Sequence, residues 1–169
     1  LIRFESQLLD PKLWDMAHKS GCRSLYYGLE SANERIIKLV KKDTDIKAAK
    51  INLEQAKRVG IWSHVMCFYG FPSETPEEAE DTRQFLIQPQ DMIPSVEMYF
   101  FVLYKSAPVM FQTEEYKIKV KENSEHDLAL DFYYTPDSGQ TTEEAMARYE
   151  DFYRNDFDPW ALRINAREH

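Results

Sequence analysis

The fold is decided by residues 60–76, which read GIWSHVMCFYGFPSETP. The apolar run between Gly60 and Gly70 is aromatic and β-branched enough for a buried strand, and the two glycines punctuate its ends. Beyond it, Thr75 is followed by a proline at the first helical position and then by Glu78, a combination that begins a helix. The stretch therefore predicts a strand, a short loop and a helix.

A matching unit lies upstream, between Gly21 and Gly28. The run over residues 22–27 is again aromatic and β-branched, so we expect a second buried strand there. Ser31 and Glu34 form a capping-box pair, which predicts that another helix begins at this point. Two strand-to-helix units in succession are typical of an α/β fold.

Further strands and helices extend this pattern on both sides. Strands are expected over residues 1–6 and 96–104, and helices between Pro11 and Gly21 and over residues 46–58. Connections of this length allow parallel crossovers, so we expect parallel (βα) units that form a small open sheet or part of a barrel. No glycine-rich phosphate loop follows the first strand, which argues against a dinucleotide-binding half.

The alternation of strands and helices stops near residue 108, where a second part of the chain begins. Residues 133–140 contain the sequence TPDSG and are expected to form a loop, and Thr141 with Glu144 begins a last helix. We therefore expect partial-barrel (βα) units in residues 1–108 and an α-rich C-terminal extension in residues 109–169.

Composition excludes several classes of function. The 21 basic and 29 acidic residues give a net charge of −8, which does not favour a nucleic-acid or anionic-membrane partner. The longest apolar run, residues 98–104, is far shorter than the about 18 residues of a membrane helix. Cys22 and Cys67 are far apart without a histidine at metal-ligand spacing, so we expect no metal site, and a reducing, cytoplasmic setting fits best.

The chemistry of parallel α/β folds takes place beyond the carboxyl ends of the strands. Glu30 follows the strand that ends near Gly28, and Glu74 follows the next strand. Glu30 is suited to accept hydrogen bonds from a ribose diol, and Ser31 is suited to donate one. The alternative is that such residues serve helix starts. That alternative is preferred for Glu74, whereas both roles stay open for Glu30.

Five segments together resemble the second half of a radical S-adenosylmethionine (SAM) domain. In order they are GCR at 21–23, YGLES at 27–31, LVKK at 39–42, GI at 60–61 and FYGFPSET at 68–75, with Thr82 beyond them. The resemblance covers residues 1–108 and is closest to a subgroup of Fe–S oxidoreductases that often carry a cobalamin-binding domain. It implies an incomplete TIM-like (βα)6 barrel, in which these strands are the third to the sixth.

The resemblance also implies a set of SAM-binding residues. Arg3 corresponds to a polar residue that faces the methionine part, Glu30 to one near the nucleoside and methionine parts, and Lys42 to a cation that reaches the methionine carboxylate. The strand that ends at residues 68–70 corresponds to the one that packs on adenine. The remaining predicted contacts are Ser31, Phe68, Gly70 and the backbone of Tyr104.

In the family that this sequence resembles, three cysteines after the first barrel strand hold a [4Fe–4S] cluster. Neither that strand nor those cysteines is in this sequence, and we expect Cys22 and Cys67 to be packed thiols and His64 to be a packed histidine. We therefore expect part of a longer enzyme that is inactive alone and whose partner is the missing N-terminal part of the same polypeptide. The alternative is a free-standing α/β module that binds a ligand or partner without catalysis. The substrate, whether small molecule or peptide, is not indicated.

A partial barrel leaves the strand at residues 1–6 without a neighbour, and an open edge favours pairing. We expect either self-association through this edge or coverage by the extension, for which residues 128–134 are the candidate.

Overall fold

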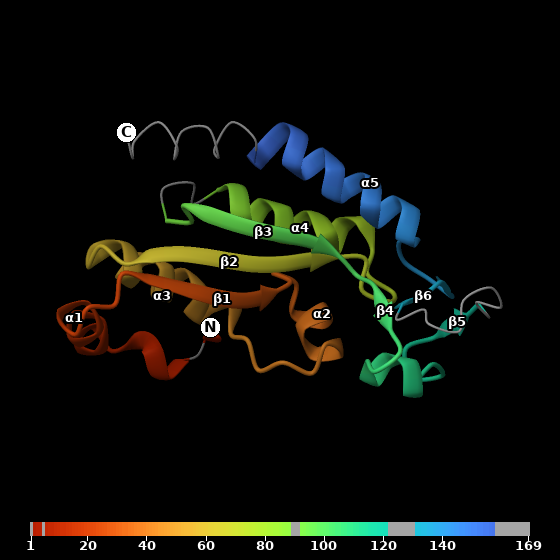
Figure 1. Cartoon of the computed structure of the whole chain (residues 1–169), viewed down its shortest axis with the longest axis horizontal. Coiled ribbons are helices and arrows are strands. Elements are labelled where there is room, and N and C mark those ends of the chain that lie inside the picture. Colours follow the sequence, from red (N-terminus) through yellow and green to blue (C-terminus); the bar gives the residue numbers. More distant parts are fainter. Residues whose placement is uncertain (1, 5, 89–91, 122–130, 158–169) are drawn as a thin grey trace.

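The computed structural model describes residues 2–4, 6–88, 92–121 and 131–157. Its centre is a three-stranded parallel sheet with the order β1-β2-β3 (Figure 1). The strands are β1 (Ser24–Glu30), β2 (Trp62–Tyr69) and β3 (Ser95–Phe100). All pairings are parallel, as the sequence predicts, because a helical crossover separates each strand from the next.

Helices precede the sheet and connect its strands. They are η1 (Ser6–Leu9), α1 (Pro11–Lys19), α2 (Glu34–Leu39), α3 (Ile46–Arg58) and α4 (Pro76–Ile87). The predicted limits of α3 are confirmed, as is the capping box in which the side chains of Thr75 and Glu78 each accept from the other residue's backbone amide. The start of α2 was predicted wrongly. Asn33, not Ser31, is its N-cap, because the Asn33 side chain accepts from the amides at positions 35 and 36.

The strand predicted over residues 1–6 is reduced to a single parallel bridge between Ile2 and Tyr27. The ring of Phe4 is fully buried and stacks on that of Tyr27, with centroids 4.3 Å apart. The chain then turns into η1 at Ser6, so the pairing ends before it can extend along β1. The N-terminal segment is thus anchored to the sheet edge by one bridge and one ring stack.

The two faces of the sheet differ in their surroundings. One face carries the main core and packs against α3, α4 and the later helix α5 (Thr142–Phe152), and α3 and α4 lie behind the sheet in Figure 1. We call the other one the open face. It consists of Tyr26, Gly28, Trp62, His64, Met66, Phe68, Ser95, Glu97 and Tyr99. Tyr26 and Tyr99 on it are each 50% exposed.

The extension builds a second small core beyond the carboxyl ends of the strands. After β4 (Leu103–Tyr104), which pairs with it, the elements of this part are η2 (Pro108–Phe111), β5 (Ile118–Val120), β6 (Asp131–Phe132), β7 (Tyr134–Pro136), α5 and the π-helix η3 (Tyr153–Phe157). β4 pairs with β6 and β5 with β7, both antiparallel, and the buried apolar residues between them form one cluster. The extension therefore contains short strands beside the predicted helix.

Two predicted elements near this junction were wrong in their limits. The strand expected over residues 96–104 leaves the parallel sheet after Phe100, and only Leu103 and Tyr104 resume pairing, in a different sheet. The loop expected over residues 133–140 includes β7, because its backbone pairs with β5. Of the stretch 128–134, proposed to cover the open edge, residues 128–130 lie outside the described part of the chain.

Candidate cofactor-binding site

Glu30 is directed onto the open face by an irregularity at the end of β1. The pairing with β2 shifts between Gly28 and Glu30, and Glu30 has a positive φ of 67°. Its carboxylate turns back over Gly28, where an added Cβ would lie 2.8 Å from Glu30 Oε1 and 3.8 Å from Lys42 Nζ. Only glycine at position 28 leaves this carboxylate and ammonium close to the backbone.

Lys42 forms an ion pair with Glu30, so the structure brings together two residues that lie on either side of α2, 12 positions apart. The side chain of Glu30 is 17% exposed and that of Lys42 is 42% exposed, so both are open to a ligand. The pair offers a carboxylate acceptor and an ammonium donor at one point. An amino acid carries an ammonium and a carboxylate group on the same carbon atom, and these two groups complement the carboxylate and ammonium of this pair.

Arg3 lies next to this pair because of the N-terminal bridge. The amide of Ile2 donates to Tyr26 O at 2.8 Å, and the amide of Gly28 donates to Ile2 O at 3.2 Å. These two bonds place Arg3 beside Gly28 along the sheet edge, and side chains alternate along an extended chain, so Arg3 is on the open-face side. Glu30 and Lys42 therefore meet at Gly28, and the backbone of Arg3 lies beside that residue, while a role of Arg3 in cofactor binding stays a prediction.

The C-terminal extension holds the loop that carries Lys42. Lys41 has a positive φ of 57°, and its ammonium lies 2.9 Å from Glu115 Oε1 and 5.5 Å from the ring centroid of Tyr116. The hydrogen bond to Glu115 raises the pKa of Lys41. The Tyr116 hydroxyl donates to Leu39 O at 3.3 Å. The extension thus fixes the backbone on which Lys42 is presented, a contribution that the sequence did not reveal.

Ser31 is fully buried and its hydroxyl bonds within the protein. It lies 3.0 Å from the hydroxyl of Thr82 and accepts from the amide of Asn33 at 3.1 Å. Thr82 also accepts from the amide of Ala32 at 3.0 Å. These bonds fasten the loop between β1 and α2 to α4, and a role of Ser31 in cofactor binding stays a prediction.

Gly70 is enclosed by the loop after β2 and by the extension. Its amide donates to Glu74 Oε2 at 2.6 Å, and its carbonyl accepts from the Tyr134 hydroxyl at 3.0 Å. An added Cβ would lie 2.4 Å from the Cβ of Ala145 in α5, which explains the glycine at this position by packing. A contact between Gly70 and a ligand stays a prediction.

Glu74 does not serve the helix start, the role preferred for it from the sequence. It is fully buried, and burial raises its pKa to about 7. Besides the bond from Gly70, its carboxylate accepts from Gln140 Nε2 at 3.4 Å, and its carbonyl accepts from the Gln140 amide at 2.7 Å. The signal was present in the sequence, because the pair Thr75 and Glu78 already satisfies the start of α4.

Phe68 and Tyr104, the two other predicted contacts, lie in different surroundings. The ring of Phe68 on the open face packs against Phe71 at 5.9 Å and Phe101 at 6.2 Å between centroids. Tyr104 belongs to β4, where it pairs with Asp131, and is 53% exposed. Phe68 therefore borders the site from β2, whereas Tyr104 is separated from it by the break after β3.

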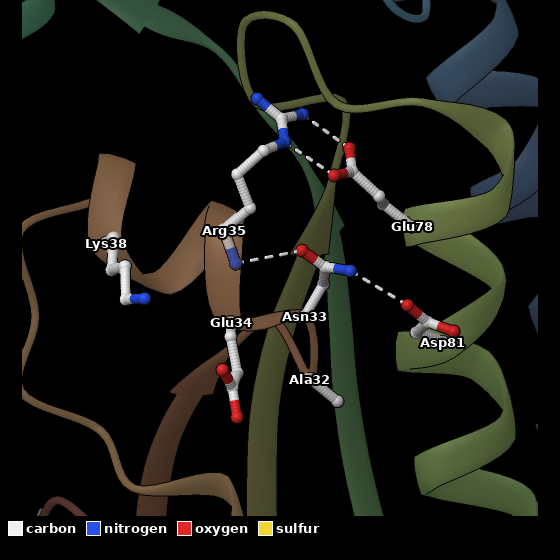
Figure 2. A pocket seen from close by; sticks show the side chains of 7 residues that line it. All are labelled: Ala32, Asn33, Glu34, Arg35, Lys38, Glu78 and Asp81. Atoms are coloured by element: carbon white, nitrogen blue, oxygen red, sulfur yellow. Dashed lines mark hydrogen bonds and ion pairs between the residues drawn. The ribbon is translucent and has the colours of Figure 1, made fainter.

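A pocket of about 500 Å³ lies between the start of α2 and α4 (Figure 2). An ion pair and a hydrogen bond join its two sides. Arg35 binds Glu78 through two nitrogens, and Asn33 Nδ2 donates to Asp81 Oδ2 at 2.8 Å, as Figure 2 shows. The pairing raises the pKa of Arg35 and lowers that of Glu78. None of the predicted site residues lines this pocket, and its polar groups fasten α2 to α4.

The family is decided by a sequence comparison. The sequence model of the Radical SAM superfamily matches residues 2–86, half of the chain, a stretch that includes Glu30 and Lys42. The chain belongs to the radical SAM superfamily. It is 34% identical over 67 residues to an uncharacterized methyltransferase, PH0819, of Pyrococcus horikoshii, a match that covers 40% of this chain and 15% of that protein.

A solved structure shares the radical SAM fold. Coproporphyrinogen III oxidase (HemN) from Escherichia coli, described as a radical SAM enzyme, aligns with a TM-score of 0.58 at 16% identity. The alignment covers 87% of this chain and 30% of that one, so the chain spans less than a third of either relative. At this identity the likeness shows the fold alone, and it is the α/β fold with a parallel sheet that the sequence predicts.

The residues of this radical SAM chain fit one of the family's two cofactors and not the other. The Glu30–Lys42 pair over Gly28 suits the methionine part of SAM. Cys67 is buried on the covered face, and burial raises the pKa of its thiol, which disfavours the thiolate that iron requires. The described ranges contain no group of three or more His, Cys, Asp or Glu placed to hold a metal. The same ranges contain no helix long and apolar enough to cross a membrane.

Proposed function

We propose that this chain supplies the methionine-binding side of the SAM site in a longer radical SAM enzyme. The observation that carries the proposal is the Glu30–Lys42 ion pair over Gly28, at the carboxyl end of β1. Lys42 binds the carboxylate of SAM, Glu30 its ammonium group, and Arg3 adds a second cation beside Gly28. Bound SAM would undergo the reductive cleavage on which the superfamily's chemistry depends, with the electron coming from the [4Fe–4S] cluster that the rest of the enzyme would hold.

The cluster ligands come from a part of the polypeptide outside this sequence. Cys22 and Cys67 are the two cysteines of the chain, and two thiols do not complete a site for three ligands. The principal partner of this chain is therefore the remainder of its own polypeptide, and we infer that the chain alone is not catalytic. The edge of the sheet at β1, which Ile2 covers with a single bridge to Tyr27, also favours self-association.

The enzyme as a whole belongs, on this proposal, to the Fe–S oxidoreductases that often carry a cobalamin domain, and it works in the cytoplasm. The resemblance of residues 1–108 to that subgroup supports the first statement, and the scarcity of cysteines supports the second. The name of the 34% identical relative favours methyl transfer as the first reaction to assay. The alternative is a free-standing α/β module that binds a ligand or partner without catalysis. It predicts that SAM binding does not depend on Glu30 or Lys42.

Calorimetric titration of SAM into this chain tests the proposal. We expect weak binding by the unmodified chain, because the iron that also holds SAM is missing. Glu30→Ala and Lys42→Ala each remove a charge-assisted contact and should weaken binding about tenfold. Lys38→Ala is the matched control, since Lys38 is an exposed lysine of α2 outside the ion pair. SAM affinity that stays the same in all three variants would refute the assignment of the site.

A further inference from the structure

A second group of polar and aromatic side chains lies on the open face, in register with the Glu30–Lys42 pair. Gly28 of β1 pairs with Met66 of β2, and Met66 pairs with Glu97 of β3. Neighbouring strands are about 4.8 Å apart, so the Cα atoms of Gly28 and Glu97 are separated by about 10 Å across one row. The next row towards the start of the strands consists of Tyr26, His64 and Ser95.

The members of this group are joined by direct contacts. His64 Nδ1 lies 2.7 Å from Ser95 Oγ, and His64 Nε2 lies 3.3 Å from Glu97 Oε2. The ring of Tyr26 is tilted against the imidazole with centroids 4.7 Å apart. The Tyr99 hydroxyl donates to the other oxygen of Glu97. The sequence predicted a packed histidine, but His64 is one link in a chain that runs from Ser95 to Tyr99.

This arrangement leaves Glu97 ionised and able to accept further bonds. The hydrogen bond from Tyr99, and then that from His64, lower the pKa of Glu97. A carboxylate has about four lone-pair sites and two are used here, so each oxygen accepts one more donor. The Glu97 side chain is 42% exposed on the open face. It therefore offers a fixed negative charge to a ligand on this surface.

The surface beside Glu97 is aromatic. Tyr26 is 50% exposed and Trp62, the next residue of β2 on this face, is 38% exposed. The imidazole of His64 lies between Tyr26 and Glu97. A flat ring of a ligand that stacks on Tyr26 would therefore lie within one side-chain length of the Glu97 carboxylate. Aromatic faces bind flat rings and cations, and the carboxylate adds a preference for a positive group. A purely structural cross-strand pair would need neither the exposed rings nor the ionised acceptor.

We propose that this part of the open face binds the substrate, a small molecule with a flat ring and a cationic amine, with the ring on Tyr26 and the nitrogen at Glu97. The inference rests on the proposed function, because the SAM site about 10 Å away is what makes a ligand here a substrate. Positive charge is favoured by Glu97, and a flat ring by Tyr26 and Trp62.

Three probes with one ring and different end groups test the charge preference. Phenethylamine, 2-phenylethanol and phenylacetate are titrated into the chain labelled on its histidine rings, and binding is followed by NMR shifts of His64. We expect phenethylamine to bind best and phenylacetate worst. Glu97→Gln should weaken the amine about tenfold and reduce the difference between amine and alcohol. Tyr26→Ala should weaken amine and alcohol alike.

The controls separate this inference from the proposed function. Glu150→Gln changes an exposed carboxylate on α5 and should leave phenethylamine binding unchanged. Lys42→Ala should weaken SAM binding about tenfold without changing the affinity for the amine, so weaker SAM binding alone does not affect this inference. The inference would be overturned by equal affinity for the three probes or by the absence of a shift of the His64 signals. It would also be overturned if the shifts followed protein concentration alone, as self-association would produce. Circular dichroism checks that each variant is folded.

Discussion

The carboxylate of Glu30 folds back over Gly28 and meets the ammonium of Lys42. The contact depends on a bulge at the end of β1 and on a residue without a side chain at position 28. It places the acidic and the basic group of the site on the same surface of the sheet.

Gly28→Ala should therefore reduce SAM binding and leave the fold largely intact. The new Cβ would lie 2.8 Å from Glu30 Oε1, so the end of a flexible side chain must move, at little cost to stability. The free energy of unfolding should change by less than about 1 kcal/mol, while SAM affinity falls several-fold. Urea denaturation and calorimetry measure the two quantities. An unchanged affinity would mean that Glu30 is not used in its observed position.

Tyr116→Leu tests whether the extension positions Lys42. The change removes the hydroxyl bond to Leu39 and the ring beneath Lys41, so the loop loses two attachments. SAM binding should weaken roughly fivefold although Tyr116 belongs to the extension and not to the site. Phe111→Leu is the control, because Phe111 is a 77% exposed aromatic residue of the same extension. Equal effects of both substitutions would argue against a specific positioning role.

Glu74 makes stability depend on pH. The pKa of its carboxyl group is about 7 in the folded chain, against an ordinary value of 4.5. Between pH 4.5 and 7 the folded state therefore keeps Glu74 protonated, whereas the unfolded state does not. Unfolding free energy should fall as the pH rises through this range, by about 3 kcal/mol in total. Glu74→Gln should remove that loss and be more stable than the original chain at pH 8.

Urea denaturation at several pH values measures the effect. Glu77→Gln is the control, since this neighbouring carboxylate is exposed and its pKa is lowered instead. A Glu74→Gln variant with the same pH profile as the original chain would show that Glu74 is ionised without cost when buried.

Gly139 joins the extension to the loop after β2. It has a φ of +87°, and an added Cβ would lie 2.5 Å from the backbone carbonyl oxygen of Glu74. Gly21 has a similar φ of +98° but open space around its Cβ position. Gly21→Ala should lower the free energy of unfolding by about 1–2 kcal/mol, because alanine disfavours a positive φ. Gly139→Ala should lower it clearly more, because the new Cβ would also clash with the backbone of Glu74, which cannot move aside. Thermal unfolding compares them, and equal losses would contradict the close contact.

The chain alone should form no stable cluster. Cys67 is buried and Cys22 is half-buried at the opposite end of the sheet from Glu30. Anaerobic reconstitution followed by iron and sulfide analysis should give far less than one cluster per chain. A stoichiometric, stable cluster would contradict the inference that the ligands lie outside this sequence.

The local signals in the sequence predicted the elements of the parallel sheet well. Proline at N1 and the capping box of Thr75 and Glu78 fix the start of α4, and the run of residues 46–58 gives α3 its limits, because these signals act within one helical turn. The residue resemblance also selected Glu30 and Lys42, which lie together in the structure.

Features that depend on distant segments were missed. Residues 1–6 have strand composition, but η1 ends the pairing after one bridge. Ser31 was expected to cap α2, yet its hydroxyl is used by Thr82, a residue of α4. The burial of Glu74 depends on Gln140 from the extension. No local pattern reports such contacts, because they form only when the two parts of the chain pack together.

The proposed contact between Lys42 and the carboxylate of SAM is tested by a ligand that lacks this carboxylate. SAM and its decarboxylated analogue, which lacks only that group, are titrated calorimetrically into the original chain and into Lys42→Ala. The original chain should prefer SAM about tenfold, and Lys42→Ala should bind both compounds equally. A preference for SAM that survives the loss of Lys42, or no preference in the original chain, would contradict the account.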